Sequence, residues 1–458
     1  MPIQSDESTS TAANVVHGRP DDTSADAGLI LLFAEDFAAL PPAIPLAARA
    51  TVLGRSEPAD VILPHTAVSR LHARISRTDD GYVLRDLDSR NGVLVQGRRI
   101  TEAVLRPHDV VRIGDALFKF VDRGVHAHAA YRIDGTVAPE ARRVTIAGAV
   151  GGLQMARVSA EIATIGPTDL PVLISGETGT GKELVARALH EASGRSGPFR
   201  AINCAAIPQN LVETELFGFK KGAFTGATRD HPGLVRAAMG GTLLLDEVGD
   251  MPLEAQAKLL RMLESHEVRP VGGVLTEGID VRVIAATHRD LRASVESGAF
   301  RGDLFARLNV ASVALPPLRH RKEDLWMLVR RTMADAGAAD RGVTFRFMVA
   351  VCHYDWPFNV RELVSAVRRA VSVSDRGPLD APDLPEAVTT AMTDYGKQGD
   401  APAAGKKVPA GRPSASELAE LLREHHGNVA AVARVLGKDR AQIHRWMHQL
   451  GIDPDAFR

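Results

Sequence analysis

The segment 176–182 constrains the fold of this chain more than any other part of the sequence. It follows the apolar run 171–174, begins a helical pattern, and reads Gly176, Glu177, Thr178, Gly179, Thr180, Gly181 and Lys182. A glycine-rich turn between a strand and a helix is the context of a phosphate-binding loop, because backbone N–H groups and the helix N-terminus face the phosphates. Lys182 is expected to reach the β- and γ-phosphate oxygens. Glu183 follows it, where many such loops carry a magnesium-contacting hydroxyl. The segment therefore predicts an α/β domain that binds a nucleotide.

The hydropathy pattern around this loop indicates a covered parallel sheet. From about 144 to 315, helical patterns alternate with unbroken apolar runs at 171–174, 241–245 and 281–285. Such runs are typical of parallel strands buried on both faces. One helix is predicted from the spacing of its apolar residues, Leu253, Ala257, Leu260 and Leu263. Residues 316–375 are helix-like throughout and predict a small α-helical lid.

An acidic pair ends one of the predicted strands. Asp246 and Glu247 follow the run 241–245, and the carboxyl end of such a strand lies beside the phosphate-binding loop. Such a pair on its own is more often a solvated strand end. Next to this loop, Asp246 is expected to hold magnesium and Glu247 to polarise the attacking water. Arg301 and Arg307 could neutralise charge on the γ-phosphate, although their spacing alone does not distinguish them from surface arginines.

The front of the chain has a different pattern. Residues 1–27 are polar and without periodicity, and we expect a disordered tail that offers Thr9, Thr11 and Thr23. In residues 28–123, short apolar runs alternate with Gly, Asp and Asn turn signals, which predicts an all-β sandwich. Residues 124–143 are interpreted as a linker.

The end of the chain predicts a small helical module. Residues 376–413 are rich in Pro, Ala, Gly and Lys and predict a flexible linker. Within 414–458 the pattern indicates three short helices, the last with an apolar face formed by Ile443, Trp446, Met447 and Leu450. Its polar residues suit a recognition helix that contacts DNA: Lys438, Arg440, Gln442, His444 and Arg445. A three-helix dimerisation module is the alternative.

Charge, hydropathy and cysteine content limit the kinds of DNA, membrane and disulfide contact that this chain can make. The net charge is −1, so DNA contact must be local, and residues 405–458 carry nine Lys/Arg against six Asp/Glu. No apolar run approaches the about 20 residues of a membrane helix, and a cytoplasmic protein without membrane contact is expected. Cys204 and Cys352 are the only cysteines and are expected to be reduced core thiols.

The stretch 172–362 resembles the AAA+ domain of sigma-54-dependent transcription activators, the bacterial enhancer-binding proteins. Its most specific part is the hexapeptide Gly222, Ala223, Phe224, Thr225, Gly226 and Ala227. In that family this loop projects from a hexameric ring, contacts sigma-54, and moves as ATP is hydrolysed with Mg²⁺. From the residues alone, an ordinary glycine turn that buries one phenylalanine would be the simpler interpretation.

The resemblance implies roles for further residues. Asn203 matches the residue that switches the catalytic glutamate, Thr287 the first sensor, and Arg361 the second sensor that contacts ATP. Arg301 and Arg307 match arginine fingers that act across a subunit boundary, and Glu183 matches the family's usual residue. The sequence departs from the family pattern at three positions: His288 replaces Asn, Arg236 replaces Glu, and Phe358 replaces Gly.

Residues 53–92 resemble a forkhead-associated (FHA) domain, and the C-terminal module resembles a Fis-type helix-turn-helix. The FHA resemblance implies phosphothreonine recognition by Arg55, Ser69, Arg70 and Asn91, with His72 bracing the loops. A guanidinium and fixed donors suit a dianionic phosphate. Arg90 replaces a residue that is often Thr, and a sandwich that has lost binding is the alternative.

Together these features predict a sigma-54-dependent activator. Its expected partners are sigma-54 RNA polymerase holoenzyme, upstream enhancer DNA, a phosphothreonine protein or Ser/Thr kinase, and further copies of the chain, from a dimer to a hexamer. The rival interpretation is a phosphopeptide-binding, DNA-bound scaffold or repressor with a degenerate ATPase. His288 and the altered front pocket are the only support for that rival.

Overall fold

The computed structural model describes residues 26–79, 81–224, 227–374, 377–398, 413, 415–424, 429–436, 440–450 and 452. The chain divides into two compact units, Met1–Ala401 and Pro402–Arg458, which are described separately. The predictions for the tail up to residue 25 and for Thr225, Gly226 and Lys438 lie outside the described residues. Among the residues that are described, no helix is long and apolar enough to cross a membrane.

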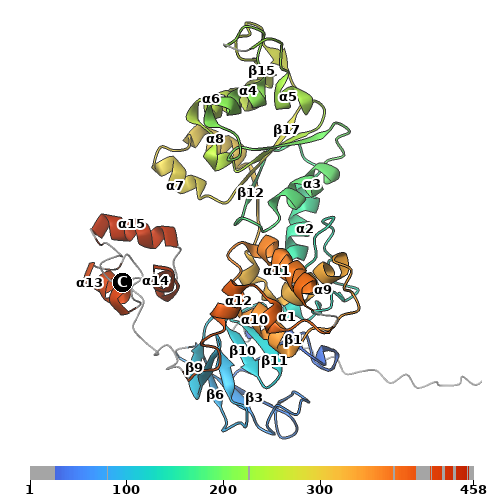
Figure 1. Ribbon diagram of the computed structural model, residues 1–458, viewed down its shortest axis with the longest axis vertical. Helices are drawn as coiled ribbons and strands as arrows, with labels where there is room; N and C mark the ends of the chain where they lie inside the picture. The colour runs from blue at the N-terminus through green and yellow to red at the C-terminus, as the bar shows by residue number, and fades with distance from the viewer. Residues whose placement is uncertain are drawn as a thin grey trace, which may run out of the picture. The chain divides into compact units, whose positions relative to one another are not determined.

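The front of the first unit is a β-sandwich, as its turn pattern predicts (Figure 1). One sheet has the order β2-β1-β11-β10-β7-β8 and the other β4-β3-β5-β6-β9. The first sheet comprises β1 (Gly28–Ala34), β2 (Ala43–Pro45), β7 (Val93–Val95), β8 (Arg98–Ile100), β10 (Val110–Ile113) and β11 (Ala116–Val121). The second comprises β3 (Ala50–Gly54), β4 (Val61–Ile62), β5 (Ala73–Thr78), β6 (Gly81–Asp86) and β9 (Glu102–Leu105).

The residues predicted as a linker after the sandwich are partly packed. Helix α1 (Val125–His128) follows β11, and Val125 and Ile133 are buried. Backbone N–H of Val125 donates to Asp26 O, so this segment is joined to the first residues of the sandwich. The linker predicted over 124–143 is therefore packed against the sandwich at its start, because the apolar side chains there complete a core.

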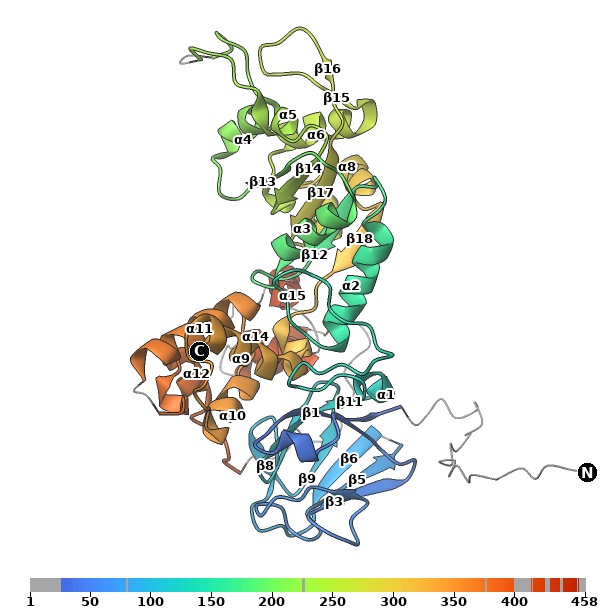
Figure 2. The same cartoon turned by 90° about the vertical axis from the view of Figure 1, so that its right-hand side faces the viewer.

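The central domain is a five-stranded parallel sheet in the order β13-β14-β17-β12-β18 (Figure 2). Its strands are β12 (Val172–Ser175), β13 (Phe199–Asn203), β14 (Thr242–Asp246), β17 (Arg282–Thr287) and β18 (Ala311–Ala314). Helices α2 (Leu153–Ile165) and α3 (Lys182–Ala192) share one apolar cluster with the sheet. A second cluster packs α4 (Gln209–Phe217), α5 (Gly233–Ala237), α6 (Leu253–Ser265), α7 (Leu291–Glu296) and α8 (Gly302–Leu308) against the sheet. Both faces are covered, and the inner strands β12, β14 and β17 are largely apolar.

Helix α6 has a different buried face from the one predicted. Leu253 is 50% exposed, whereas the buried side chains are Ala255, Gln256, Leu259 and Met262. The existence of the helix could be predicted from its 3.6-residue period. Its orientation could not, because the buried position 256 carries a polar side chain. Gln256 Nε2 donates to Met251 O at 2.8 Å, and its Oε1 accepts from Arg301 N at 2.9 Å.

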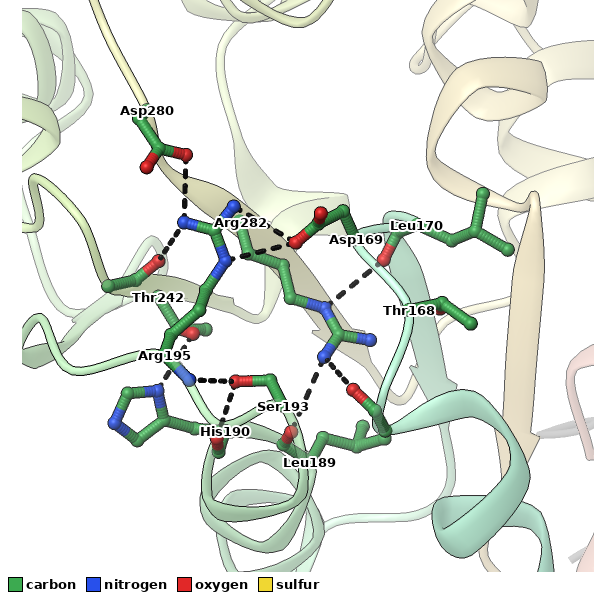
Figure 3. A network of polar contacts seen from close by, with 12 residues as sticks. Thr168, Asp169, Leu170, Leu189, His190, Ser193, Arg195, Thr242, Asp280 and Arg282 are labelled. Atoms are coloured by element: carbon green, nitrogen blue, oxygen red, sulfur yellow. Dashed lines mark hydrogen bonds and ion pairs between the residues drawn. The ribbon is translucent and has the colours of Figure 1, made fainter.

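A buried arginine joins both helices of the first cluster to the sheet (Figure 3). Arg282 begins β17 and is 1% exposed. Its guanidinium donates to Gly166 O at 2.7 Å and Leu189 O at 3.4 Å, at the C-terminal ends of α2 and α3. Cations are favoured at such ends because the carbonyl groups there lack helical partners. Nearby, Arg195 bridges Asp169 and Asp280, as Figure 3 also shows.

A helical lid follows the sheet. It contains η3 (Leu318–His320), η4 (Lys322–Asp324), α9 (Leu325–Asp335), α10 (Phe345–His353) and α11 (Asn359–Val373), then η5 (Ala381–Asp383) and α12 (Glu386–Ala391). Leu384 and Val388 are buried in the lid core, so the predicted flexible linker cannot begin at 376. The composition of this stretch did not reveal these two buried apolar residues, because prolines and alanines surround them.

The two cysteines, Cys204 and Cys352, are free and buried, and burial raises the pKa of each thiol to about 12.

The described residues of the second unit form three helices, α13 (Ala415–Glu424), α14 (Val429–Leu436) and α15 (Arg440–Leu450). Ile443, Trp446 and Met447 are buried in its core, which confirms the predicted apolar face of α15. His444 and Arg445 are exposed and Gln442 is half-buried. The backbone of Arg440 begins α15, but its side chain lies outside the described residues.

Candidate functional site

The phosphate-binding loop lies between β12 and α3, as its sequence context predicts. Gly179 and Gly181 have φ values of +80° and +105°, which disfavour residues with a side chain. A Cβ atom on Gly179 would lie 2.1 Å from Phe358 O at the start of α11. Glycine therefore allows the lid backbone to approach the loop directly.

Lys182 is the first residue of α3, and its side chain is 7% exposed. Its Nζ donates to Gly176 O at 3.0 Å and to Glu247 Oε1 at 3.2 Å. A pocket of about 830 Å³ opens here, lined by the loop, by strand ends and by α11. The predicted residues that line it are Thr178, Gly179, Thr180, Gly181, Lys182, Glu183, Asn203, Asp246, Glu247, His288 and Arg361.

Glu247 has the geometry of a positioned base. Its φ of 51° is unusual for a residue with a side chain, and strain of this kind is concentrated at functional sites. Oε2 contacts His288 Nδ1 at 2.6 Å and accepts from His288 N at 3.2 Å. Burial alone would raise the pKa of Glu247, but His288 and Lys182 hold it below its ordinary value. The carboxylate is therefore ionised at neutral pH and able to accept a proton.

Asp246 is the residue expected to hold magnesium. Oxygen ligands suit Mg²⁺, which typically binds one or two carboxylates together with substrate phosphates. Burial and the nearby Glu247 raise the pKa of Asp246, so a cation would stabilise its ionised form. Asp246 and Asp250 line the pocket that contains Lys182 and fit such an ion. Bound magnesium would neutralise phosphate charge.

Asn203 lies at this edge but contacts a different carboxylate from the one expected. Its Nδ2 donates to Asp246 Oδ2 at 3.3 Å rather than to Glu247. Its Oδ1 accepts from Ala205 N at 2.9 Å. A switching role towards Glu247 therefore remains a prediction that would require a rearranged side chain.

The two expected sensors lie at the phosphate-binding loop or line the pocket. Thr287 ends β17, is buried, and its carbonyl accepts from Gly176 N at 3.2 Å. Arg361 is exposed and lines the pocket from α11.

The expected arginine fingers, Arg301 and Arg307, are exposed and do not line this pocket within one chain. Arg301 pairs with Asp303 at 2.7 Å. Arg236, one of the family departures, pairs with Glu277 at 2.7 Å away from the pocket.

Two lid residues that hold the loop were missed from the sequence. Asn359 has φ 55° and is fully buried, and its Nδ2 donates to Thr178 O at 3.0 Å and Glu177 Oε2 at 3.2 Å. Arg319 donates to both carboxylate oxygens of Glu177, at 2.7 and 2.6 Å. The sequence contains one indication of such a contact, Glu177 within the phosphate-binding loop. An acidic side chain there needs a nearby cation to offset its charge.

The hexapeptide loop follows α4 and presents an aromatic side chain. Phe224 is 44% exposed, and its ring meets Phe219 edge-on at 4.9 Å between centroids. Gly222 N donates to Ala227 O at 2.9 Å, which closes the base of the loop. The described part of the loop therefore displays an apolar group near its tip.

Three loops of the sandwich, which carry Arg55, Ser69 and Asn91, lie in contact with one another. Arg55 N donates to Ser69 O at 2.9 Å, and Asn91 Nδ2 donates to Ala67 O at 2.7 Å. His72 is buried and braces these loops: its Nδ1 faces Ser69 N at 3.0 Å and its Nε2 faces Gly92 O at 3.2 Å. The side chains of Arg55, Arg70 and Asn91 are exposed beside this brace, and Ser69 is half-buried.

Comparisons with known proteins match the front, central and lid domains of the chain. The sigma-54 interaction domain matches residues 150–314, the FHA domain 51–114, and an AAA+ ATPase lid domain 319–400. Regulatory protein AtoC of Escherichia coli is 41% identical over 307 residues, which cover 66% of this chain and 67% of that protein. Transcriptional regulatory protein ZraR of Salmonella typhimurium is 40% identical over 347 residues, covering 74% and 75%. The structure of NtrX from Brucella abortus in complex with ATP matches with a TM-score of 0.50 and 32% identity, covering 68% and 70%.

Proposed function

The chain belongs to the sigma-54-dependent transcriptional regulators, as an AAA+ ATPase with an FHA domain, and on that premise we propose that it uses ATP hydrolysis to remodel the closed complex of sigma-54 RNA polymerase. The observation that carries the proposal is the joint presence of two features in one domain. These are a nucleotide pocket that contains both Lys182 and Glu247, and an exposed Phe224 on a closed loop.

In the proposed reaction, Lys182 leaves Glu247 and binds the nucleotide phosphates. Glu247 then accepts a proton from the attacking water, and the oxygen of that water bonds to the γ-phosphorus. The bond between the γ-phosphorus and the β–γ bridging oxygen breaks in the same step, so that ADP leaves with the bridging oxygen. His288 keeps the carboxylate oriented through Oε2. The charge that develops on the γ-phosphoryl oxygens requires further cations, and Arg301 and Arg307 do not line the pocket of their own chain.

This arrangement supports a ring in which neighbouring subunits complete each site. Arg301 and Arg307 both belong to the exposed surface of the α8 region, and Gln256 holds the backbone of Arg301 at 2.9 Å. A head-to-tail contact could therefore bring them to the pocket of the next subunit. We propose a hexamer, with dimers held on DNA as its precursors.

The second unit is the proposed DNA-binding module. His444 and Arg445 are exposed on α15, opposite the face buried by Ile443 and Trp446. A polar helix face with basic groups suits entry into the major groove. Binding upstream of a promoter would keep the ATPase close to the polymerase.

The front domain is proposed to sense a phosphothreonine. Arg55 and Arg70 supply exposed guanidinium groups beside Ser69 and Asn91, and His72 fixes the loops that carry them. Guanidinium–phosphate pairs are among the stronger polar contacts in proteins. A Ser/Thr kinase would thus set the activity of this chain, through its own phosphorylated tail or through a partner.

A transcription assay with sigma-54 holoenzyme on a template with an upstream site tests the proposal. Transcripts should require hydrolysable ATP, and a phosphothreonine peptide should change their amount for wild type but not for Arg55→Ala. Arg74→Ala, an exposed arginine on β5 of the same sandwich, is the matched control. ATP-independent transcript levels would favour the scaffold interpretation, and an equal peptide response in Arg55→Ala would remove the phosphothreonine assignment.

A further inference from the structure

Strands β1 and β11 of the first sheet of the sandwich are buried on both faces. All seven residues of β1 and all six of β11 are buried, although an antiparallel sheet with one solvent face would alternate. The lid covers the outer face. Phe33 meets Trp326 at 5.1 Å and Phe345 at 6.2 Å between ring centroids, and Arg112 lies 5.0 Å above the ring of Phe345. Sandwich and lid therefore share one apolar core.

A buried ion pair lies within this shared core. The side chain of Lys119 in β11 is 1% exposed, and its Nζ contacts Glu323 Oε2 in η4 and donates to His320 O at 3.0 Å. Glu323 is 8% exposed, and its other oxygen lies 3.7 Å from His128 Nδ1. Burial alone would raise the pKa of Glu323, but Lys119 holds it below its ordinary value.

Burial also lowers the pKa of His128 to about 4, so its ring is neutral at pH 7 and is not a second cation for Glu323. Among the described residues, Lys119 is thus the cation whose ammonium contacts this carboxylate. Removing it would leave a buried charge without compensation, which is strongly unfavourable.

The segment that Lys119 holds also contacts the phosphate-binding loop. Arg319 pairs with Glu177 through two hydrogen bonds, at 2.7 and 2.6 Å. Arg321 is 2% exposed and donates to Thr180 O at 3.3 Å. Residues 319–323 therefore have two sets of contacts: Arg319 and Arg321 reach the loop, whereas the carbonyl of His320 and the carboxylate of Glu323 reach the sandwich.

We infer that Lys119 of the FHA domain is a positioning residue for ATP, which acts by holding residues 319–323 so that Arg319 and Arg321 fix the phosphate-binding loop. The front domain is then part of the scaffold of the nucleotide site. This inference rests on the ATPase activity alone, so it can hold whether or not phosphothreonine binds, and whether or not sigma-54 is the target.

A charge-balanced double variant tests the inference in the full-length protein. Lys119→Met with Glu323→Gln removes both charges and keeps similar volumes, so that no buried ion is left unpaired. We expect the KM for ATP to rise about fivefold with kcat changed less than about twofold, the size of coupling carried by such networks. Amide hydrogen exchange should become faster both in residues 319–323 and in the loop 176–182.

The matched control is Arg85→Met with Glu102→Gln. That pair joins β6 and β9 on the other sheet and is exposed, with 63% and 46% of the two side chains accessible. Its KM and exchange should equal those of wild type. If the double variant folds poorly, Arg319→Gln gives a second test, because the side chains of Arg319 and Glu177 are 36% and 39% exposed and neither is left as a buried ion. It should raise the KM as well.

Two results would overturn the inference. One is faster exchange in residues 319–323 while the loop and the KM stay as in wild type, which would make the ion pair only a joint between domains. The other is an unchanged KM and unchanged exchange in both segments for a folded double variant.

Discussion

Replacing Glu247 by glutamine should leave ATP bound and stop its hydrolysis. Glutamine keeps the shape of the side chain, so its amide can still meet His288, which now contacts Oε2 at 2.6 Å. It cannot accept the proton of the attacking water. Loss of a general base lowers rates about 10²- to 10⁴-fold. That corresponds to about 3–5 kcal/mol in the barrier.

Nucleotide affinity should not fall in this variant. In the structure Lys182 Nζ lies 3.2 Å from Glu247 Oε1, and this contact must be broken when the lysine turns to phosphate. A neutral glutamine competes less for the ammonium group, so ATP binding should be equal to or tighter than in wild type.

Phosphate release and equilibrium nucleotide binding check both expectations. Glu254→Gln is the matched control, since Glu254 is exposed in the first turn of α6 and does not line the pocket. Hydrolysis by Glu247→Gln at the wild-type rate would refute the assignment of the base. Loss of ATP binding would instead show that the carboxylate is needed to build the pocket.

Three further changes test other parts of the structure. Arg282→Met should lower the free energy of unfolding by about 2–4 kcal/mol, because carbonyl groups at the ends of α2 and α3 lose a buried charged donor, and an unchanged urea midpoint would contradict this. Gly179→Ala should weaken ATP binding about tenfold in a nucleotide titration, since its Cβ would meet Phe358 O at 2.1 Å. The pKa of His128 falls to about 4 on folding, so below about pH 6.5 the unfolded chain binds a proton that the folded chain does not. The free energy of unfolding therefore falls as the pH falls from about 6.5 towards 4, by about 2 kcal/mol at pH 5. His128→Gln should lose correspondingly less stability between pH 7.5 and pH 5 in urea unfolding, and equal losses in both proteins would refute the buried neutral ring.

Features with a local chemical cause could be predicted from the sequence. The phosphate-binding loop follows from glycines, a preceding strand and Lys182, all within a few residues. Asp246 and Glu247 follow from their place at a strand end, because the carboxyl ends of parallel strands meet at one edge. The apolar face of α15 follows from its period alone.

Features that depend on distant partners could not be predicted in this way. Asn359 and Arg319 reach Glu177 over at least 140 positions of sequence, and no local pattern encodes that pairing. The packing of the sandwich against the lid has one indication in the sequence of β11. All six residues of β11 are buried, and Lys119 is the one charged residue among them. A lone cation in an apolar strand indicates a buried carboxylate partner elsewhere.

We propose that hydrolysis in the pocket is transmitted through the hexapeptide loop to sigma-54. Thr225→Ala tests it most directly, with phosphate release and open-complex formation by sigma-54 holoenzyme measured on the same preparation. We predict hydrolysis within about twofold of wild type and loss of open complexes, because none of the described hexapeptide residues, Gly222, Ala223, Phe224 and Ala227, lines the pocket. Wild-type amounts of open complex from Thr225→Ala would contradict the account.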